Sequence, residues 1–72
     1  MRRLKLKFVG GFDFDFKEKV LEVEEGKRYS DVLRELGINP ETVVIVKDGM
    51  PVPTDDFVEE GEVTVMRVIS GG

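Results

Sequence analysis

The chain contains no cysteine, no histidine and no tryptophan among its 72 residues. Without cysteine it can form neither a disulfide nor a thiol nucleophile, and without histidine as well it lacks the ligand spacing of a zinc finger. The missing histidines also remove the side chain that most often acts as a general base near neutral pH. We therefore expect no enzyme active site, no metal site and no bound cofactor.

Basic charge is also scarce, since fifteen acidic residues outnumber eleven basic ones and give a net charge of -4. A negative protein gains little from releasing counterions from nucleic acid, so proteins are the expected partners and nucleic acids are not. Residues 4–7 alternate leucine with lysine where a signal peptide would have an apolar run. We expect a monomeric cytoplasmic protein without a membrane span. Its length suits a single domain.

Two stretches with alternating apolar residues, 4–9 and 19–24, predict the first two strands. A tight turn directly after the first strand would place carboxylates on its apolar face. Setting Leu6 opposite Leu21 and Leu4 opposite Val23 keeps the apolar faces together, because directly opposed residues share a sheet face.

This pairing leaves residues 10–17 as a longer tip that contains Phe12, Phe14 and Phe16. We favour the interpretation in which one or two of these rings fold back over the end of the core. The other interpretation is an exposed aromatic contact tip for a partner.

A short helix is predicted after the second strand. Ser30 is a good N-cap, Asp31 complements the positive end of a helix, and Gly37 suits the left-handed position that follows a helix. Such a helix of about two turns is unstable alone and must pack on the sheet. Its apolar stripe consists of Val32, Leu33 and Leu36.

The second half of the chain predicts a hairpin and a final strand. The β-branched residues 43–46 indicate a central strand, and Asp48-Gly49 is a strong hairpin signal. Residues 50–53 contain two prolines and suit only a short edge strand. A capped turn then places Phe57 in the core, and residues 63–68 alternate as the last strand before Gly71 and Gly72.

Together these elements predict an α+β fold, a β-grasp with a mixed sheet of four to five strands and one helix packed on one face. The first and last strands would run parallel in the middle of the sheet. A two-layer α+β fold with another strand order is the alternative. The expected core comprises Leu4, Leu6, Leu21, Val23, Val32, Leu33, Leu36, Ile45, Phe57, Val63 and Val65.

The whole chain resembles the ubiquitin-like β-grasp proteins. The resemblance rests on the segment Leu-Glu-Val-Glu-Glu at 21–25, the Asp-Gly hairpin, the Glu-Gly-Glu turn at 60–62, and the strand at 63–68 that leads to a terminal Gly-Gly. It is greatest for the prokaryotic branch of sulfur carriers and small archaeal modifiers. Residues 1–69 would form the domain and residues 70–72 a flexible tail.

The resemblance implies a carrier with its reactive group at the C-terminus. A partner enzyme of the ubiquitin-activating type would use ATP and magnesium to adenylate the carboxylate of Gly72. The activated group would then take up sulfur as a thiocarboxylate for an acceptor enzyme, or join protein lysines. Glycine lacks a Cβ, so Gly71 and Gly72 can enter a narrow channel, with Ser70 and Ile69 as the adjoining tail.

A partner-binding surface is predicted on the face of the sheet that points away from the helix. If Ile45 and Val65 face the helix, then Val44, Val46, Met66 and Val68 lie on the other side, with Arg67 beside them. In one alternative, the methylenes of Lys5, Lys7 and Arg67 cover these residues. Two further alternatives are that the terminal glycines are only a frayed end, and that the domain binds its partners non-covalently.

Overall fold

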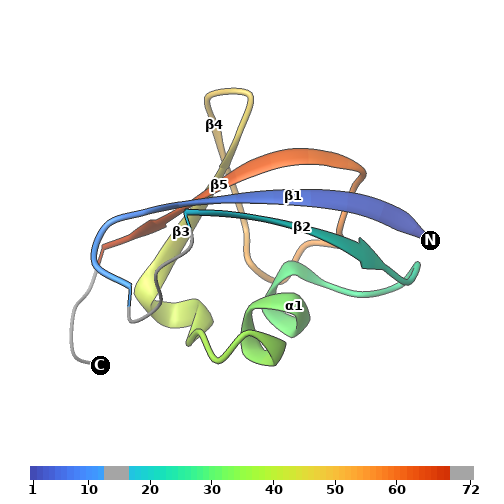
Figure 1. Cartoon of the computed structure of the whole chain (residues 1–72), viewed down its shortest axis with the longest axis horizontal. Helices are drawn as coiled ribbons and strands as arrows, with labels where there is room; N and C mark the ends of the chain where they lie inside the picture. Colours follow the sequence, from blue (N-terminus) through green and yellow to red (C-terminus); the bar gives the residue numbers. More distant parts are fainter. Residues whose placement is uncertain (13–16, 69–72) are drawn as a thin grey trace.

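The computed structural model describes residues 1–12 and 17–68, which form a five-stranded sheet with one helix on one face (Figure 1). This arrangement confirms the predicted α+β β-grasp fold. The elements in chain order are β1 (Arg2–Val9), β2 (Glu18–Val23), α1 (Tyr29–Glu35), the 3₁₀ helix η1 (Pro40–Thr42), β3 (Val43–Lys47), β4 (Met50–Val52) and β5 (Gly61–Arg67).

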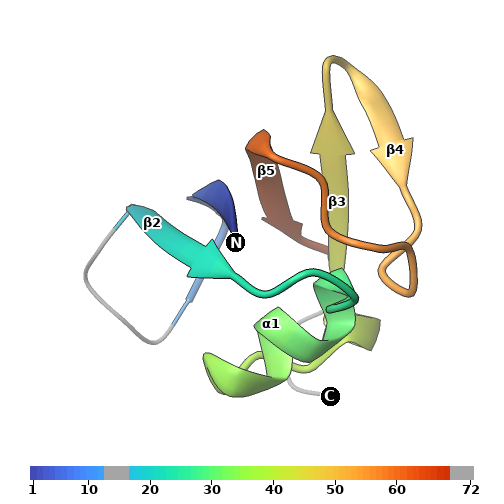
Figure 2. The same ribbon diagram turned by 90° about the vertical axis from the view of Figure 1, so that its right-hand side faces the viewer.

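The strand order across the sheet is β2-β1-β5-β3-β4. β1 and β5 are parallel neighbours in the middle, and every other pair is antiparallel. Figure 2 shows β2 and β4 at the two edges, with α1 below the sheet. The expected central parallel pair is therefore present, and it places the last strand between two others.

The predicted register of the first hairpin is wrong by two residues. Leu4, and not Leu6, lies opposite Leu21, and Leu6 pairs with Lys19. A shift of two keeps every side chain on its own face, so the apolar pattern is equally compatible with both registers. In the observed register the Phe8 N–H donates to the Lys17 carbonyl at 2.8 Å, and Gly10, with a φ of +108°, follows the end of β1 at Val9.

The core lies between the sheet and α1. Of the residues expected there, eight are buried, and Leu21 and Leu36 pack against them while partly exposed. The other buried apolar residues are Phe8, Tyr29, Ile38, Val43 and Val58.

Phe57 does not enter the core, contrary to prediction, and is 55% exposed. Its ring lies beside the guanidinium of Arg28, whose Cζ is 4.8 Å from the ring centroid. The neighbouring Val58 is buried in its place. Tyr29 fills the space below, and its hydroxyl accepts a hydrogen bond of 3.3 Å from the Glu59 backbone N–H. The ring of Tyr29 is therefore buried at this end of the core, whereas the ring of Phe57 is exposed.

The helix begins at Tyr29 with Arg28 as its N-cap, and not with Ser30 as predicted. The N–H of Ser30 donates to the carbonyl of Thr54 at 2.7 Å, while Asp31 accepts from the Arg28 N–H at 3.0 Å. A distant loop thus satisfies an N-terminal donor that a local cap would otherwise satisfy.

Two turn predictions are confirmed. Gly37 has a φ of +79° after the helix, and the N–H of Ile38 donates to the Leu33 carbonyl at 2.8 Å, as in a Schellman motif. Asp48 and Gly49 have φ values of 53° and 78° between the paired strands β3 and β4. Positive φ at both central positions matches the twist of a tight hairpin.

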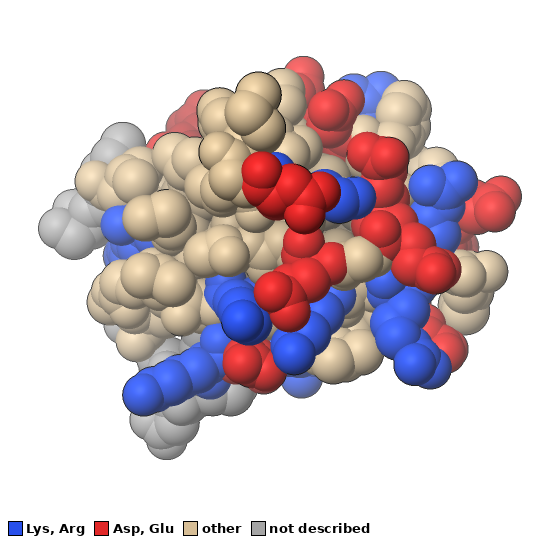
Figure 3. Space-filling model, turned by 90° about the horizontal axis from the view of Figure 1, so that it is seen from above, with Lys and Arg blue, Asp and Glu red and all other residues tan. Residues whose placement is uncertain are grey.

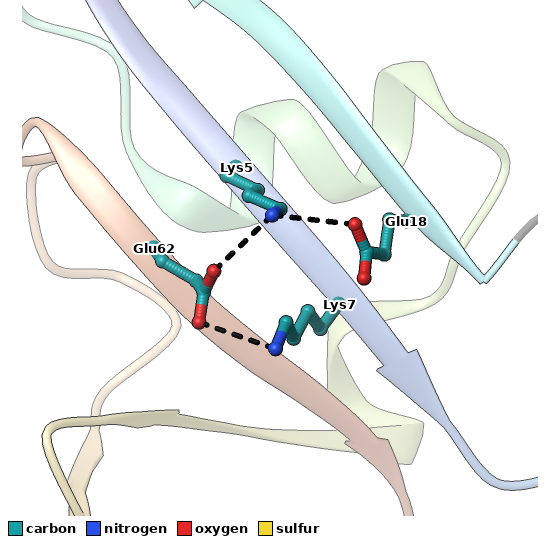
Figure 4. Close-up of polar contacts among 4 residues, drawn as sticks. All are labelled: Lys5, Lys7, Glu18 and Glu62. Atoms are coloured by element: carbon teal, nitrogen blue, oxygen red, sulfur yellow. Dashed lines mark ion pairs between the residues drawn. The ribbon is translucent and has the colours of Figure 1, made fainter.

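Charged side chains from three strands meet on the open face of the sheet, the face away from α1. Lys5 Nζ lies 3.3 Å from Glu18 and 3.5 Å from Glu62, and Lys7 Nζ lies 3.5 Å from Glu62 (Figure 4). The hydrogen bond to Glu18 and the charge of Glu18, then that of Glu62, raise the pKa of Lys5. The cluster joins β2, β1 and β5 on the solvent side.

We predict that Val58→Ala lowers the free energy of unfolding by about 2 kcal/mol, because it removes two buried methyl groups and leaves a cavity. Phe57→Ala removes a larger but exposed ring and should cost about 1 kcal/mol or less. Urea denaturation of both variants measures the difference. A larger loss for Phe57→Ala would contradict the assignment of Val58 to the core.

We predict that Glu18→Gln lowers the pKa of Lys5, as measured by NMR titration of the lysine side chains. A lysine pKa raised above its ordinary value of 10.5 in the folded state stabilises the fold fully below pH 10.5. That contribution is lost as the pH rises through the folded pKa. The stability difference between wild type and Glu18→Gln should therefore shrink at strongly alkaline pH. A difference that is constant across this range would contradict the assignment.

Candidate functional site

The end of β5 is held in place by the turn before β3. The N–H of Val68 donates to the carbonyl of Thr42 at 3.0 Å, and the buried Thr42 hydroxyl donates to the carbonyl of Asn39 at 2.7 Å. Asn39 also accepts a hydrogen bond from the Glu41 N–H at 3.0 Å. The sequence signal for this support is an asparagine cap followed by proline in the first helical turn.

The predicted reactive residue Gly72 lies outside the described residues, as do the adjoining tail residues Ile69, Ser70 and Gly71. What the structure establishes is their point of attachment. Val68 continues a central strand that is hydrogen-bonded on both sides, so the chain leaves the sheet from a fixed position.

The end of β1 packs closely against the same end of β5. A Cβ at Gly10 would lie 3.0 Å from the Cβ of Arg67, so only glycine fits there without a shift. The guanidinium of Arg67 donates to the Gly11 carbonyl at 2.6 Å, and its Cζ lies 5.9 Å from the ring centroid of Phe12. Arg67 thereby fastens the start of the 10–17 loop to the last strand.

Phe12 folds back over the end of the core. Its ring centroid is 5.4 Å from that of Phe8 in an edge-to-face contact, and the side chain is partly buried. This is the arrangement that the sequence favoured for one or two of the three rings. Phe14 and Phe16, the other members of the proposed aromatic tip, lie outside the described residues.

An apolar row crosses three strands on the open face of the sheet. Met66 pairs with Val9 on one side and with Val44 on the other, so the three side chains stand in register. They are 39%, 49% and 37% exposed, respectively, and Val68 is 56% exposed. Val9 was absent from the predicted surface, although its odd position in the first strand places it on the face of Lys5 and Lys7.

The remaining members of the predicted surface are placed less uniformly. Val46 lies on the open face, opposite Thr64, and is partly buried. Arg67 pairs with the buried Val43 and therefore lies on the helix side of β5, not beside Met66.

The open face is divided into an apolar end and a charged end. Figure 3 looks onto this face and shows mostly uncharged residues on the left and charged residues gathered toward the right. Lys5 and Lys7 make their ion pairs with Glu62, near the start of β5. The apolar row crosses β5 at Met66, near the end of the strand. The apolar row thus lies at the end of β5 from which the tail departs.

Over residues 1–12 and 17–68, no cluster of three or more acidic side chains has the geometry to hold a metal ion. The same part of the chain contains no helix of the length and apolar character required to cross a membrane.

Comparison with known proteins places the chain in a family. Residues 3–69 match the family model of small archaeal modifier protein 2. The chain is 64% identical over 70 residues to a protein of Archaeoglobus fulgidus, covering 97% of this chain and 98% of that protein.

Two named relatives are also similar. Small archaeal modifier protein 2 of Haloferax volcanii is 40% identical over 50 residues, covering 69% of this chain and 76% of that protein. The sulfur carrier protein TtuB of Thermus thermophilus is 42% identical over 57 residues, covering 78% of this chain and 88% of that protein. The chain therefore belongs to the family of small archaeal modifier protein 2, whose members are ubiquitin-like β-grasp carriers and not enzymes.

Proposed function

We propose that this small modifier or sulfur carrier acts through the carboxylate of Gly72, which a partner enzyme of the ubiquitin-activating type adenylates with ATP and magnesium. One named relative is a protein modifier and another is a sulfur carrier. Both outcomes follow from a single activated carboxylate, so we propose that either acceptor can use it. The fixed departure of the chain from β5 at Val68 is the observation that supports this proposal best.

The chemistry requires activation because a carboxylate is a poor electrophile. A carboxylate oxygen of Gly72 attacks the α-phosphorus of ATP and pyrophosphate leaves, which produces an acyl-adenylate. Hydrosulfide then forms a C–S bond at the carbonyl and AMP leaves, so one sulfur replaces one oxygen. A lysine amine that attacks the same carbonyl forms an amide, loses a proton and likewise releases AMP. Gly71 and Gly72 leave this carbonyl sterically open.

The apolar row is the proposed contact with the activating enzyme. Its side chains are exposed and lie at the end of β5 that leads to Gly72, so an enzyme bound there has the tail within reach. Burial of exposed valine and methionine supplies binding free energy, and the flexible Met66 adapts to the partner. The ionic cluster at the other end of the face leaves this row uncovered.

We predict that deletion of Gly71 and Gly72 abolishes modification of the chain. Incubation of the wild-type protein with its activating enzyme, magnesium, ATP and sulfide should give a product heavier by the difference between sulfur and oxygen in intact-mass spectrometry. The truncated protein should remain unchanged in mass. Its thermal unfolding should match that of wild type, because the deletion leaves every buried residue of the described core in place.

The same truncation separates the proposal from a non-covalent interaction module. Lysine-linked conjugates in cell extract would indicate protein modification, whereas a thiocarboxylate without conjugates would indicate sulfur transfer. If the truncated protein retains full cellular function and partner binding, carboxylate activation is excluded and the non-covalent module is the correct interpretation.

We predict that Val44→Asp raises the KM of the activating enzyme for this protein about tenfold. The reason is that a carboxylate in the apolar row must be desolvated when the enzyme docks. Val20→Asp is the matched control, since Val20 is also an exposed valine on the open face but lies on β2, away from the row. It should change KM less than about twofold. Equal effects of the two variants in a pyrophosphate-release assay would place the docking surface elsewhere.

A further inference from the structure

The two neighbours of β5 support its end to different lengths. On the β3 side the backbone is held as far as Val68, whose N–H donates to the Thr42 carbonyl at 3.0 Å. On the β1 side the register ends earlier, at the pair of Val9 with Met66. Figure 1 shows the ends of β1 and β5 close together at the left. Beyond Met66, a side chain of β5 makes the contact with the segment that follows β1.

That side chain is Arg67. The chain turns after β1 at Gly10, where a Cβ would lie 3.0 Å from the Cβ of Arg67 and 3.3 Å from its backbone nitrogen. At this close approach the guanidinium donates to the Gly11 carbonyl at 2.6 Å. Its Cζ lies 5.9 Å from the ring centroid of Phe12, which packs edge-to-face on the buried Phe8. Arg67 therefore connects the end of β5 to the core through Phe12.

Arg67 and the apolar row lie on opposite faces of the sheet. Arg67 pairs with the buried Val43, so its side chain lies on the helix side, whereas Met66 and Val44 point to the open face. An enzyme that docks on the apolar row therefore does not need Arg67 for binding. A contribution of Arg67 to the reaction has to act through the position of the tail.

The tail is short enough for the position of its first residue to matter. Four residues follow Val68, and when fully extended they reach at most about 14 Å. A tail drawn out in a narrow channel has little slack, so the position of Val68 decides where the carboxylate of Gly72 stands. A displacement of about 1 Å between reacting groups can lower a rate about 100-fold.

We propose that Arg67 is a positioning residue for the adenylation of Gly72, an inference that rests on the proposed function. Its bond to the Gly11 carbonyl keeps the end of β5 against the segment that follows β1, so the tail enters the enzyme from a fixed direction. The carboxylate oxygen of Gly72 then forms its bond to the α-phosphorus of ATP, and pyrophosphate leaves. Arg67 acts at the start of the tail and contacts neither reactant.

The test is pyrophosphate release by the activating enzyme, with the full chain as the varied substrate. Arg67→Met keeps the methylene stem beside Gly10 but removes the guanidinium. Its kcat should fall about tenfold, with a KM within about twofold of that for wild type. Arg67→Lys keeps a cationic donor and should recover part of the kcat. Arg34→Met removes the same charge at an exposed position of α1, and as the matched control it should behave as wild type.

The division between kcat and KM distinguishes positioning from a loss of folded protein. Partial unfolding lowers the concentration of competent substrate, which raises KM but leaves kcat unchanged at saturation. Hydrogen exchange gives a second readout that needs no enzyme. The Val68 amide should exchange faster in Arg67→Met, whereas the amide of the buried Val65 in the same strand should exchange as in wild type.

Gly10→Ala tests the same contact from the side of β1. The added Cβ displaces Arg67 from the Gly11 carbonyl, so kcat should fall as it does in Arg67→Met. The double variant Gly10→Ala/Arg67→Met should be no slower than the slower single variant, because both changes remove one contact.

Four results would overturn the proposal while wild type is adenylated. These are a raised KM with an unchanged kcat, which would make Arg67 a docking contact, a wild-type kcat in Arg67→Met, unchanged exchange of the Val68 amide, and multiplied losses in the double variant. Absence of pyrophosphate release from wild type itself would overturn the proposed function, and this inference with it.

Discussion

The parallel pairing of β1 with β5 is the contact on which the rest of the structure depends. These strands are remote in the sequence, yet they run side by side from Leu4 opposite Gly61 to Val9 opposite Met66. β2 pairs with the other edge of β1, and the β3–β4 hairpin pairs through β3 with the other edge of β5, so the five-stranded sheet exists only when β1 and β5 pair. Leu6 and Val65 are almost fully buried beneath α1, and burial of this kind is the main favourable term in folding.

The central position of β5 also explains how a chain of this size provides both a core and the proposed binding surface. Val63 and Val65 face the helix, while Met66 stands on the open face between Val9 and Val44. Successive residues of one strand thus serve the two purposes because their side chains alternate. Val68 extends the strand to the point where the proposed reactive tail begins, and its hydrogen bond to Thr42 keeps that point fixed.

The differences between prediction and structure share a physical cause. Phe57 was assigned to the core from its hydrophobicity, but Tyr29 and Val58 occupy that region and leave the ring beside Arg28. Ser30 was assigned as the helix cap from local propensity, but the carbonyl of Thr54 already accepts its N–H. In both cases a segment distant in the sequence decided the outcome, and a local pattern contains no information about such a segment.

By itself, the sequence determined the strands, the helix, the Asp48-Gly49 hairpin and the face on which Val44 and Met66 lie, because alternation and turn chemistry are local properties. The resemblance of the whole chain to ubiquitin-like proteins indicated the family. Only the tertiary structure decided the register of β1 and β2, since two registers present the same faces. It also brought Val9 into the apolar row and the Gly11 carbonyl within reach of Arg67, because both depend on which strands become neighbours.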